Sequence, residues 1–227
     1  MNIKAIVFDL FHTLISLKSD GVARPSTSEQ LGVSEKDWNT LLWEQSKRRL
    51  RGHVKDPFEI IKELTTLAGW NISDSKLRDV ATIRQERFAE GMHAAQPHVL
   101  EALDQLRQTG LSLAICSNAD WMERKGWEDC PLSQRFDATI FSCDVGYVKP
   151  EPEIFQLCLD ELKVKAEETV FVGDGGSNEL AGAKEMGMTT VMTKEIISQI
   201  YPQVIDKRKK DADHIINHIG QLMGIIN

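Results

Sequence analysis

The sequence predicts an α/β fold: a Rossmann-like core, built on a doubly wound parallel sheet, that carries an inserted all-helical cap. Three observations predict it: short apolar runs end in polar residues, helical patterns separate these runs, and one long stretch is helical throughout. Alternation of strand and helix is typical of βαβ units, and a stretch that breaks the alternation marks an insertion. We therefore expect a core of residues 1–17 and 93–227 and a cap of residues 18–92.

The predicted strands are short, rich in β-branched residues and followed by polar side chains. Such continuous apolar runs are typical of parallel strands that are buried on both faces. The clearest runs are 4–8, 111–116 and 169–172, and weaker candidates are 138–141, 189–192 and 213–216.

Between the strands, apolar residues recur at the spacing of one helix face. The pattern covers 97–108, which stops before Gly110, then 153–162, which follows Pro152, and 177–186, which stops at Gly187. Proline at the first turn and glycine after the last turn are helix boundary signals.

The stretch 18–92 carries three helical patterns and no convincing strand. These patterns begin at Ser34, at Asp56-Pro57 and near Ser73. An all-helical insertion directly after the first strand predicts a cap over the core rather than a second enzyme.

Composition and charge argue against a disordered chain, a collagen and a nucleic-acid-binding protein. Apolar residues make up 41% and charged residues 27%, which is ordinary for a globular chain. The net charge of −7 argues against a nucleic-acid partner, because such proteins normally present a basic face. An anionic substrate remains compatible with it, since a few local cations or one metal reverse the sign of a pocket.

We expect a cytoplasmic protein, monomeric or homodimeric, without a membrane partner. The chain lacks the roughly 18 consecutive apolar residues of a membrane helix, and its apolar start lacks the features of a signal peptide. The cysteines show no CxxC spacing and are expected to be reduced; they are Cys116, Cys130, Cys143 and Cys158.

Polar residues follow the three clearest strands. Asp9 ends the first, Ser117 and Asn118 end the second, and Asp174 ends the third, while Lys149 precedes a predicted helix. Ligands of open α/β sheets bind at the carboxyl ends of the strands. Two carboxylates, a hydroxyl and a lysine that converge there can bind a divalent cation and an oxyanion together.

At these residues the chain resembles the haloacid dehalogenase-like hydrolase superfamily, in its subgroup with a small helical cap. The matching stretches are VFDLFHTL (7–14), ICSN (115–118), KPEPEIF (149–155) and VGDGGSNELAGA (172–183). With the strands around them, these stretches account for the whole core.

The resemblance implies a role for each matched residue. Asp9 is the expected nucleophile, which forms a covalent aspartyl intermediate that water hydrolyses. Ser117 is expected to hydrogen-bond the transferring group, with Asn118 and Thr13 contacting the substrate beside it. Lys149 would neutralise charge on the nucleophile and the transition state.

The resemblance also implies a magnesium site. Its expected ligands are the carboxylates of Asp9, Asp174 and Glu179 and the backbone carbonyl of Phe11. Such an octahedral set of oxygen ligands suits Mg²⁺.

Phe11 departs from the phosphatase form of the first motif. That form has a second aspartate here, which protonates the leaving alcohol and activates water, and phenylalanine can do neither. Loss of a positioned general acid costs about 10²–10⁴-fold in rate. An acyl or aryl phosphate, whose leaving group needs no proton, would avoid this cost.

Three functions compete on these residues. The first is Mg²⁺-dependent hydrolysis of a small phosphorylated metabolite, favoured because an unpaired cluster of Asp9, Asp174 and Glu179 repels itself without a cation. The second is 2-haloacid dehalogenation, for which an aromatic residue at position 11 is usual, but such enzymes use no magnesium and have serine where this chain has Asp174. The third is a binding or regulatory role without turnover.

Several basic residues have two interpretations each. His12 stands where the family usually has glycine, so it either fills a turn or, like His53 in the cap, replaces the missing acid. Arg48 and Arg49 belong to a basic cluster, 47–53, that is either a solvated helix end or a reader of the anionic substrate. The basic run 207–210 is interpreted as a solvated loop.

Overall fold

Six parallel strands form one sheet in the computed structural model, which describes residues 2–18 and 20–226. They are β1 (Ala5–Phe8), β2 (Ser112–Ser117), β3 (Ala138–Phe141), β4 (Thr169–Gly173), β5 (Thr189–Thr193) and β6 (His214–Ile216). The order is β3-β2-β1-β4-β5-β6, so the chain switches direction between β1 and β4. Ligands of doubly wound sheets bind at this switch point. The predicted fold class is confirmed.

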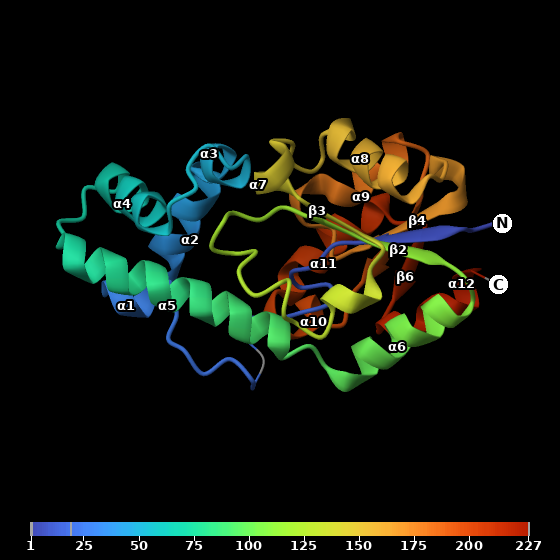
Figure 1. Ribbon diagram of the computed structural model, residues 1–227, viewed down its shortest axis with the longest axis horizontal. Helices are drawn as coiled ribbons and strands as arrows, with labels where there is room; N and C mark the ends of the chain where they lie inside the picture. The colour runs from blue at the N-terminus through green and yellow to red at the C-terminus, as the bar shows by residue number, and fades with distance from the viewer. Residues whose placement is uncertain (1, 19, 227) are drawn as a thin grey trace.

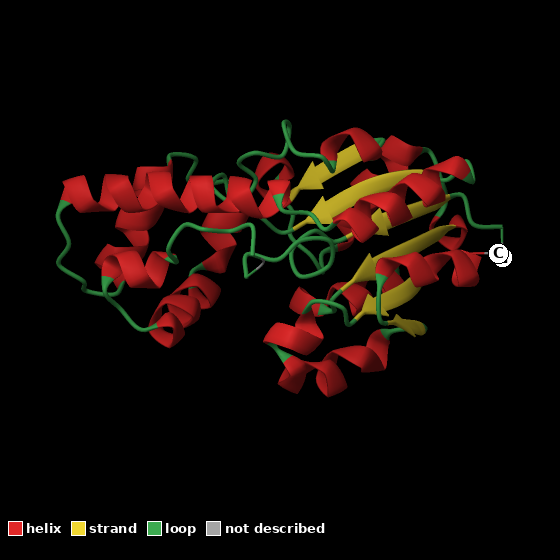
Figure 2. Cartoon of the chain, turned by 90° about the horizontal axis from the view of Figure 1, so that it is seen from below, coloured by secondary structure: helices red, strands yellow, loops and turns green. Residues whose placement is uncertain are grey.

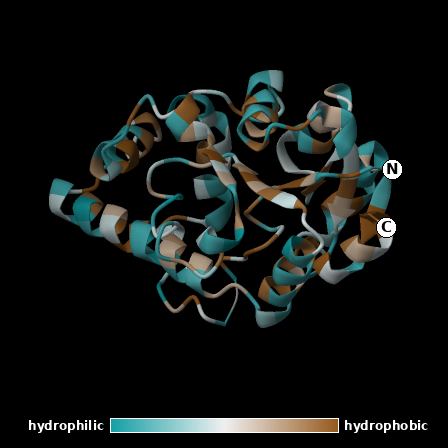
Figure 3. Ribbon diagram, turned by 45° about the vertical axis from the view of Figure 1, so that its right-hand side comes forward, coloured by the Kyte–Doolittle hydropathy of each residue, from teal (hydrophilic) through white to brown (hydrophobic). Residues whose placement is uncertain are grey.

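Helices cover both faces of the sheet (Figure 2). Successive residues of a strand therefore pack into different cores. Ile6 and Phe8 share a core with α6 (Pro97–Gln108). Val7, between them, packs in the core of the other face, with α8 (Pro152–Leu162) and α9 (Glu179–Glu185). Apolar colours accordingly run along the strands, whereas the helices alternate (Figure 3). The continuous apolar runs in the sequence have this physical cause.

A helical insertion, residues 27–93, lies beyond the carboxyl ends of the strands (Figures 1 and 2). Its helices are α1 (Thr27–Leu31), α2 (Glu35–Glu44), α3 (Ser46–Leu50), α4 (Pro57–Leu67) and α5 (Asp74–His93). The side chains of Ser34, Asp56 and Ser73 cap the first turns of α2, α4 and α5, which explains where these helices begin. The apolar faces of these helices form their own core.

The core domain and the helical insertion are joined by a buried ion network. Arg49 donates to Asp120 (2.9 Å) and Glu123 (3.1 Å), and Arg84 donates to Glu123 (2.6 Å). The two carboxylates follow β2, and Met122 between them packs into the core of the insertion. The loop after β2 is therefore part of the packing of both units.

Between β5 and β6 the chain folds into short helices, and these include the run 207–210 that the sequence predicted to be a solvated loop. They are α10 (Ile197–Ile200) and α11 (Ile205–Arg208), with 3-10 turns around them. Arg208 ends α11 with three quarters of its side chain covered, so the interpretation of 207–210 as a solvated loop is wrong for this residue. Two further short helices are α7 (Ser142–Val145) and α12 (Met223–Ile226).

Within the described part of the chain, none of the helices combines the length and the apolar character that a bilayer span requires.

Candidate active site

Asp9 lies at the carboxyl end of β1, beside β4. Its backbone N–H donates to the Val172 carbonyl (2.9 Å), which extends the ladder of the two strands by one residue. The Thr13 hydroxyl donates to Asp9 Oδ2 (2.8 Å), so the carboxylate is oriented by its own loop. That loop turns back at His12, which adopts a positive φ of 64°. Glycine is the usual residue at such an angle, which is the physical reason that position 12 is unusual here.

Lys149 bridges two carboxylates. Its Nζ lies 2.6 Å from Asp9 Oδ1 and 2.6 Å from Glu179 Oε2, with the side chain almost fully buried. Burial alone lowers the pKa of an amine, but the carboxylates of Asp9 and Glu179 outweigh it and hold the pKa of Lys149 well above its ordinary value. The ammonium is therefore protonated at any physiological pH.

Asn118 positions Lys149 through its backbone. The Asn118 amide donates to the Lys149 carbonyl (3.1 Å) and accepts from the Lys149 N–H (2.8 Å). The sequence predicted substrate contact for Asn118; it lines the cavity described below, but both ends of its amide are engaged by Lys149.

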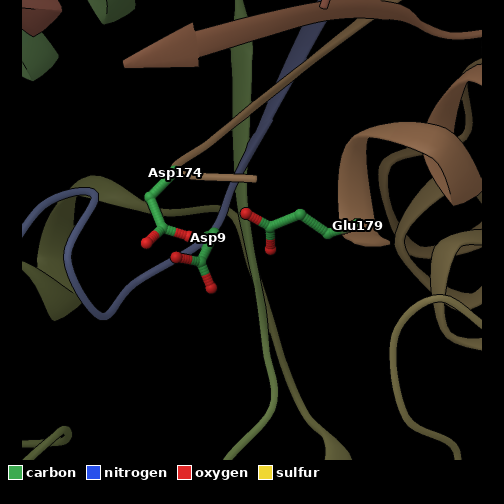
Figure 4. Close-up of side chains that lie close together, drawn as sticks. All are labelled: Asp9, Asp174 and Glu179. Carbon is green, nitrogen blue, oxygen red and sulfur yellow. The ribbon is translucent and has the colours of Figure 1, made fainter. Parts of the chain in front are cut away.

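Three buried carboxylates meet at the switch point of the sheet (Figure 4). One oxygen each of Asp9, Asp174 and Glu179 lie within 4.8 Å of one another. Backbone N–H groups fix two of them, because Gly176 donates to Asp174 Oδ1 (2.7 Å) and Gly175 donates to Glu179 Oε1 (3.0 Å). Burial and the nearby Asp9 carboxylate raise the pKa of Glu179 well above its ordinary value.

The cluster carries one cation that the sequence motifs did not reveal. The Arg208 guanidinium donates to Asp174 Oδ2 and, at 3.4 Å, to the Asp174 carbonyl. Together with Lys149 it pairs all three carboxylates. The expectation of an unpaired acidic cluster is therefore corrected: Lys149 and Arg208 already compensate most of its charge.

The donor set of this cluster fits Mg²⁺. Three buried carboxylates this close offer the hard oxygen ligands that magnesium prefers. The Phe11 backbone carbonyl, in the loop after Asp9, is the expected further ligand.

Two buried polar atoms near the cluster have no hydrogen-bond partner among the described residues. They are Ser117 Oγ, at the end of β2, and His12 Nδ1. An orphaned buried group in a native protein calls for an explanation, such as a ligand that is absent. Burial lowers the pKa of His12, so its ring is neutral at pH 7 and is poorly suited to donate a proton as the missing general acid.

Tyr201, near α10, packs edge-on against His12 with 5.6 Å between ring centroids. No pattern in the sequence indicates this contact. His53, the other candidate acid, is exposed.

A cavity of about 580 Å³ opens between the helical insertion and the strand ends, within the size range of small-molecule sites. Lys149 and Asn118 line it from the core. Its apolar lining consists of Phe11, Leu17, Leu42, Trp43, Leu50, Val148 and Pro150. Phe11 also contacts α5, where its ring meets Phe88 edge-on at 5.4 Å.

The two predicted substrate-binding arginines lie in different surroundings. Arg49 lines the cavity, but its guanidinium is held by Asp120 and Glu123 and its charge is compensated. Arg48 is not among the residues that line this cavity. It is mostly exposed and pairs with Glu63 (3.0 Å), so the structure does not support a substrate contact for Arg48.

The model of the haloacid dehalogenase-like hydrolase family matches residues 3–187, which include β1 to β4 and every carboxylate of the cluster. The chain belongs to this family. The family resemblance inferred from the four sequence motifs is thereby confirmed.

Relatives within the family differ in chemistry. The bifunctional epoxide hydrolase 2 of Rattus norvegicus is 38% identical over 51% of this chain, which spans only 22% of that protein's length. The glyceraldehyde 3-phosphate phosphatase of Methanocaldococcus jannaschii is 31% identical over 67% of this chain and 65% of its own. The (S)-2-haloacid dehalogenase 4A of Burkholderia cepacia is 28% identical over 84% and 82%.

Solved structures show the same fold. A HAD phosphatase from Thermococcus onnurineus superposes with a TM-score of 0.65 at 24% identity, covering 99% of this chain and 98% of its own. The L-2-haloacid dehalogenase of Xanthobacter autotrophicus with covalently bound chloropropionic acid gives a TM-score of 0.67 at 24% identity, with the same coverage. Fold similarity therefore does not separate a phosphatase from a dehalogenase.

Proposed function

We propose that this chain is a Mg²⁺-dependent phosphate hydrolase that acts on a small phosphorylated metabolite through a covalent intermediate on Asp9. The observation that carries the proposal is Asp174: a third carboxylate beside Asp9 and Glu179 creates an oxygen donor set for a divalent cation. The phosphatase relatives support the same chemistry.

The chain's own residues supply the two chemical steps. An oxygen of the Asp9 carboxylate attacks phosphorus, the new P–O bond forms, and the bond to the leaving oxygen breaks with its electron pair. Water then attacks the aspartyl phosphate, loses a proton, and releases phosphate and the Asp9 carboxylate. The leaving oxygen takes its proton from solvent, because Phe11 has none to give.

The surrounding groups stabilise these steps. The Lys149 ammonium, 2.6 Å from Asp9, orients the nucleophile and offsets charge that develops on the transferring group. The Ser117 hydroxyl, which has no partner among the described residues, provides a hydrogen bond to an oxygen of that group. Bound by Asp9, Asp174, Glu179 and the Phe11 carbonyl, Mg²⁺ would supply further charge neutralisation.

A second candidate function is 2-haloacid dehalogenation. Phe11 favours it, because a halide leaves without a proton and an apolar side chain is then no handicap. Lys149 and Arg208 favour it as well, since they compensate the carboxylates without a metal. The dehalogenase relative matches 82% of its own length.

One assay separates these candidates. The purified chain is given p-nitrophenyl phosphate or 2-chloropropionate, each with Mg²⁺ and with EDTA. We expect phosphate release that requires Mg²⁺ and is absent in Asp9→Asn, while the exposed Asp206→Asn keeps it as the matched control. Chloride release that EDTA leaves unchanged would overturn the proposal in favour of the dehalogenase. Silence on both substrates would favour the binding or regulatory role.

A further inference from the structure

Arg208 contacts Asp174 of the acidic cluster, although it lies outside the four sequence motifs that match the family. It ends α11, and the loop after β4 approaches it closely because that loop contains two glycines. A Cβ at Gly175 would lie 2.9 Å from the Cβ of Arg208, and Gly175 has a positive φ of 79°. Side chains at this position would push Arg208 away from Asp174.

The ion pair engages the carboxylate that Asp174 would offer to the proposed metal. Oδ2 accepts from Arg208 and Oδ1 accepts from the Gly176 N–H at 2.7 Å, so each oxygen of the carboxylate has a donor. Lys149 serves the other two carboxylates and contacts neither oxygen of Asp174 in the described hydrogen bonds. Arg208 is therefore the cation assigned to Asp174.

We propose that Arg208 is an internal competitor for the divalent cation: it holds Asp174 in the metal-free protein and releases this carboxylate when the metal binds. The inference rests on the proposed Mg²⁺ site. Two effects would oppose metal binding while the pair is intact: Asp174 Oδ2 is engaged by Arg208, and a cation held by Asp174 would be repelled by the guanidinium charge.

The competition is reciprocal. If Arg208 lowers the affinity for the metal, the metal lowers the affinity of Arg208 for Asp174 by the same factor. Arg208, the last residue of α11, contacts the loop after β4 through this ion pair, so its release is expected to loosen that end of α11. Metal occupancy of the site is thereby linked to the order of α11.

Metal binding to the full chain, measured without substrate, tests the proposal. Mn²⁺ is titrated and the free ion is followed by electron paramagnetic resonance. Coupling between sites is typically about 5- to 150-fold, so we expect Arg208→Gln to bind Mn²⁺ at least about fivefold more tightly than the wild type. Arg208→Lys, which keeps the charge but not the forked donor, should fall between them. Lys210→Gln, an exposed neighbour, should match the wild type.

Unchanged or weaker binding in Arg208→Gln would overturn the inference and leave the proposed function standing. No Mn²⁺ binding in either protein would overturn both. A second readout needs no variant: Mg²⁺ should speed amide hydrogen exchange at 205–208 in the wild type and not in Asp174→Asn. Slower or unchanged exchange in the wild type would contradict the release of Arg208.

Discussion

Glu123 holds the helical insertion on the core, and Glu123→Gln tests how strongly. This carboxylate accepts from Arg84 Nη2 (2.6 Å), from Arg49 Nη1 (3.1 Å) and from the Asp120 N–H (3.0 Å). The side chains of Glu123 and Arg84 are only 11% and 7% exposed. Glutamine keeps the shape and one acceptor oxygen, but it removes the charge and turns the other oxygen into a donor.

The expected loss follows from what remains buried. Arg49 would keep Asp120 as its carboxylate partner, whereas Arg84 would keep, among the described residues, the Thr27 hydroxyl (3.2 Å) and the ring faces of Phe88 and Trp38. Removing one partner from a buried ion pair costs about 3–5 kcal/mol. For a chain of this size that corresponds to a fall in Tm of about 6–20 °C.

Urea unfolding followed by tryptophan fluorescence measures the loss, and Glu63→Gln is the matched control. Glu63 pairs with Arg48 on the surface, where such a pair is worth at most about 1 kcal/mol. Equal midpoints for the two variants would refute the argument that the buried network anchors the insertion.

The difference in stability between the wild type and Glu123→Gln should change with pH in a definite direction. Burial raises the pKa of Glu123, but Arg49 and Arg84 outweigh it and hold the pKa below its ordinary value of 4.5. A carboxyl group whose pKa is lower in the folded state stabilises the protein at pH values above its unfolded pKa. This contribution is lost as the pH falls through the folded pKa. The wild type should therefore lose its advantage over Glu123→Gln in acid. An advantage that grows as the pH falls would contradict this assignment.

Three further expectations concern the site and the thiols. Ser117→Ala should lower kcat/KM for the aryl phosphate about 10²-fold. The urea midpoint should stay unchanged, because the Ser117 hydroxyl has no partner among the described residues. A lower midpoint with unchanged turnover would contradict this. Phe11→Asp should speed hydrolysis of alkyl phosphates more than that of p-nitrophenyl phosphate, since only the former need a proton; equal gains would argue against an acid role. Burial raises the pKa of the Cys143 thiol to about 12. A disulfide reagent at pH 8 should therefore label Cys143 only after the protein unfolds. Rapid labelling of Cys143 in the native protein would disprove this protection.

The sequence was sufficient for the sheet and for the residues that follow its strands. Parallel strands buried on both faces must be apolar without interruption, so each run stands out, and α6 begins at Pro97 and ends at Gln108 as predicted. Asp9, Lys149, Asp174 and Glu179 were identified by motif and do converge.

Short helices and long-range ion pairs could not be predicted from the sequence. The helices α1, α3 and α11 have four or five residues, too few to display a periodic face, and tertiary contacts hold them. The predicted helix at 177–186 starts only at Glu179, because Ser177 and Asn178 adopt positive φ angles. Arg208 stands 34 residues after Asp174, and a run of basic residues does not say which of them turns inward.

The sign and size of the charge at the site depend on the substrate, and this links metal dependence to substrate class. Three carboxylates against Lys149 and Arg208 leave one formal negative charge. A 2-halocarboxylate adds one more negative charge opposite the cations Lys149 and Arg208. A phosphate dianion adds two, and like charges in a buried site disfavour one another strongly. One Mg²⁺ returns the phosphate-loaded site to the charge of the empty one. On the proposed function, a phosphate substrate calls for the metal and a haloacid does not, so metal dependence and substrate class must be determined together.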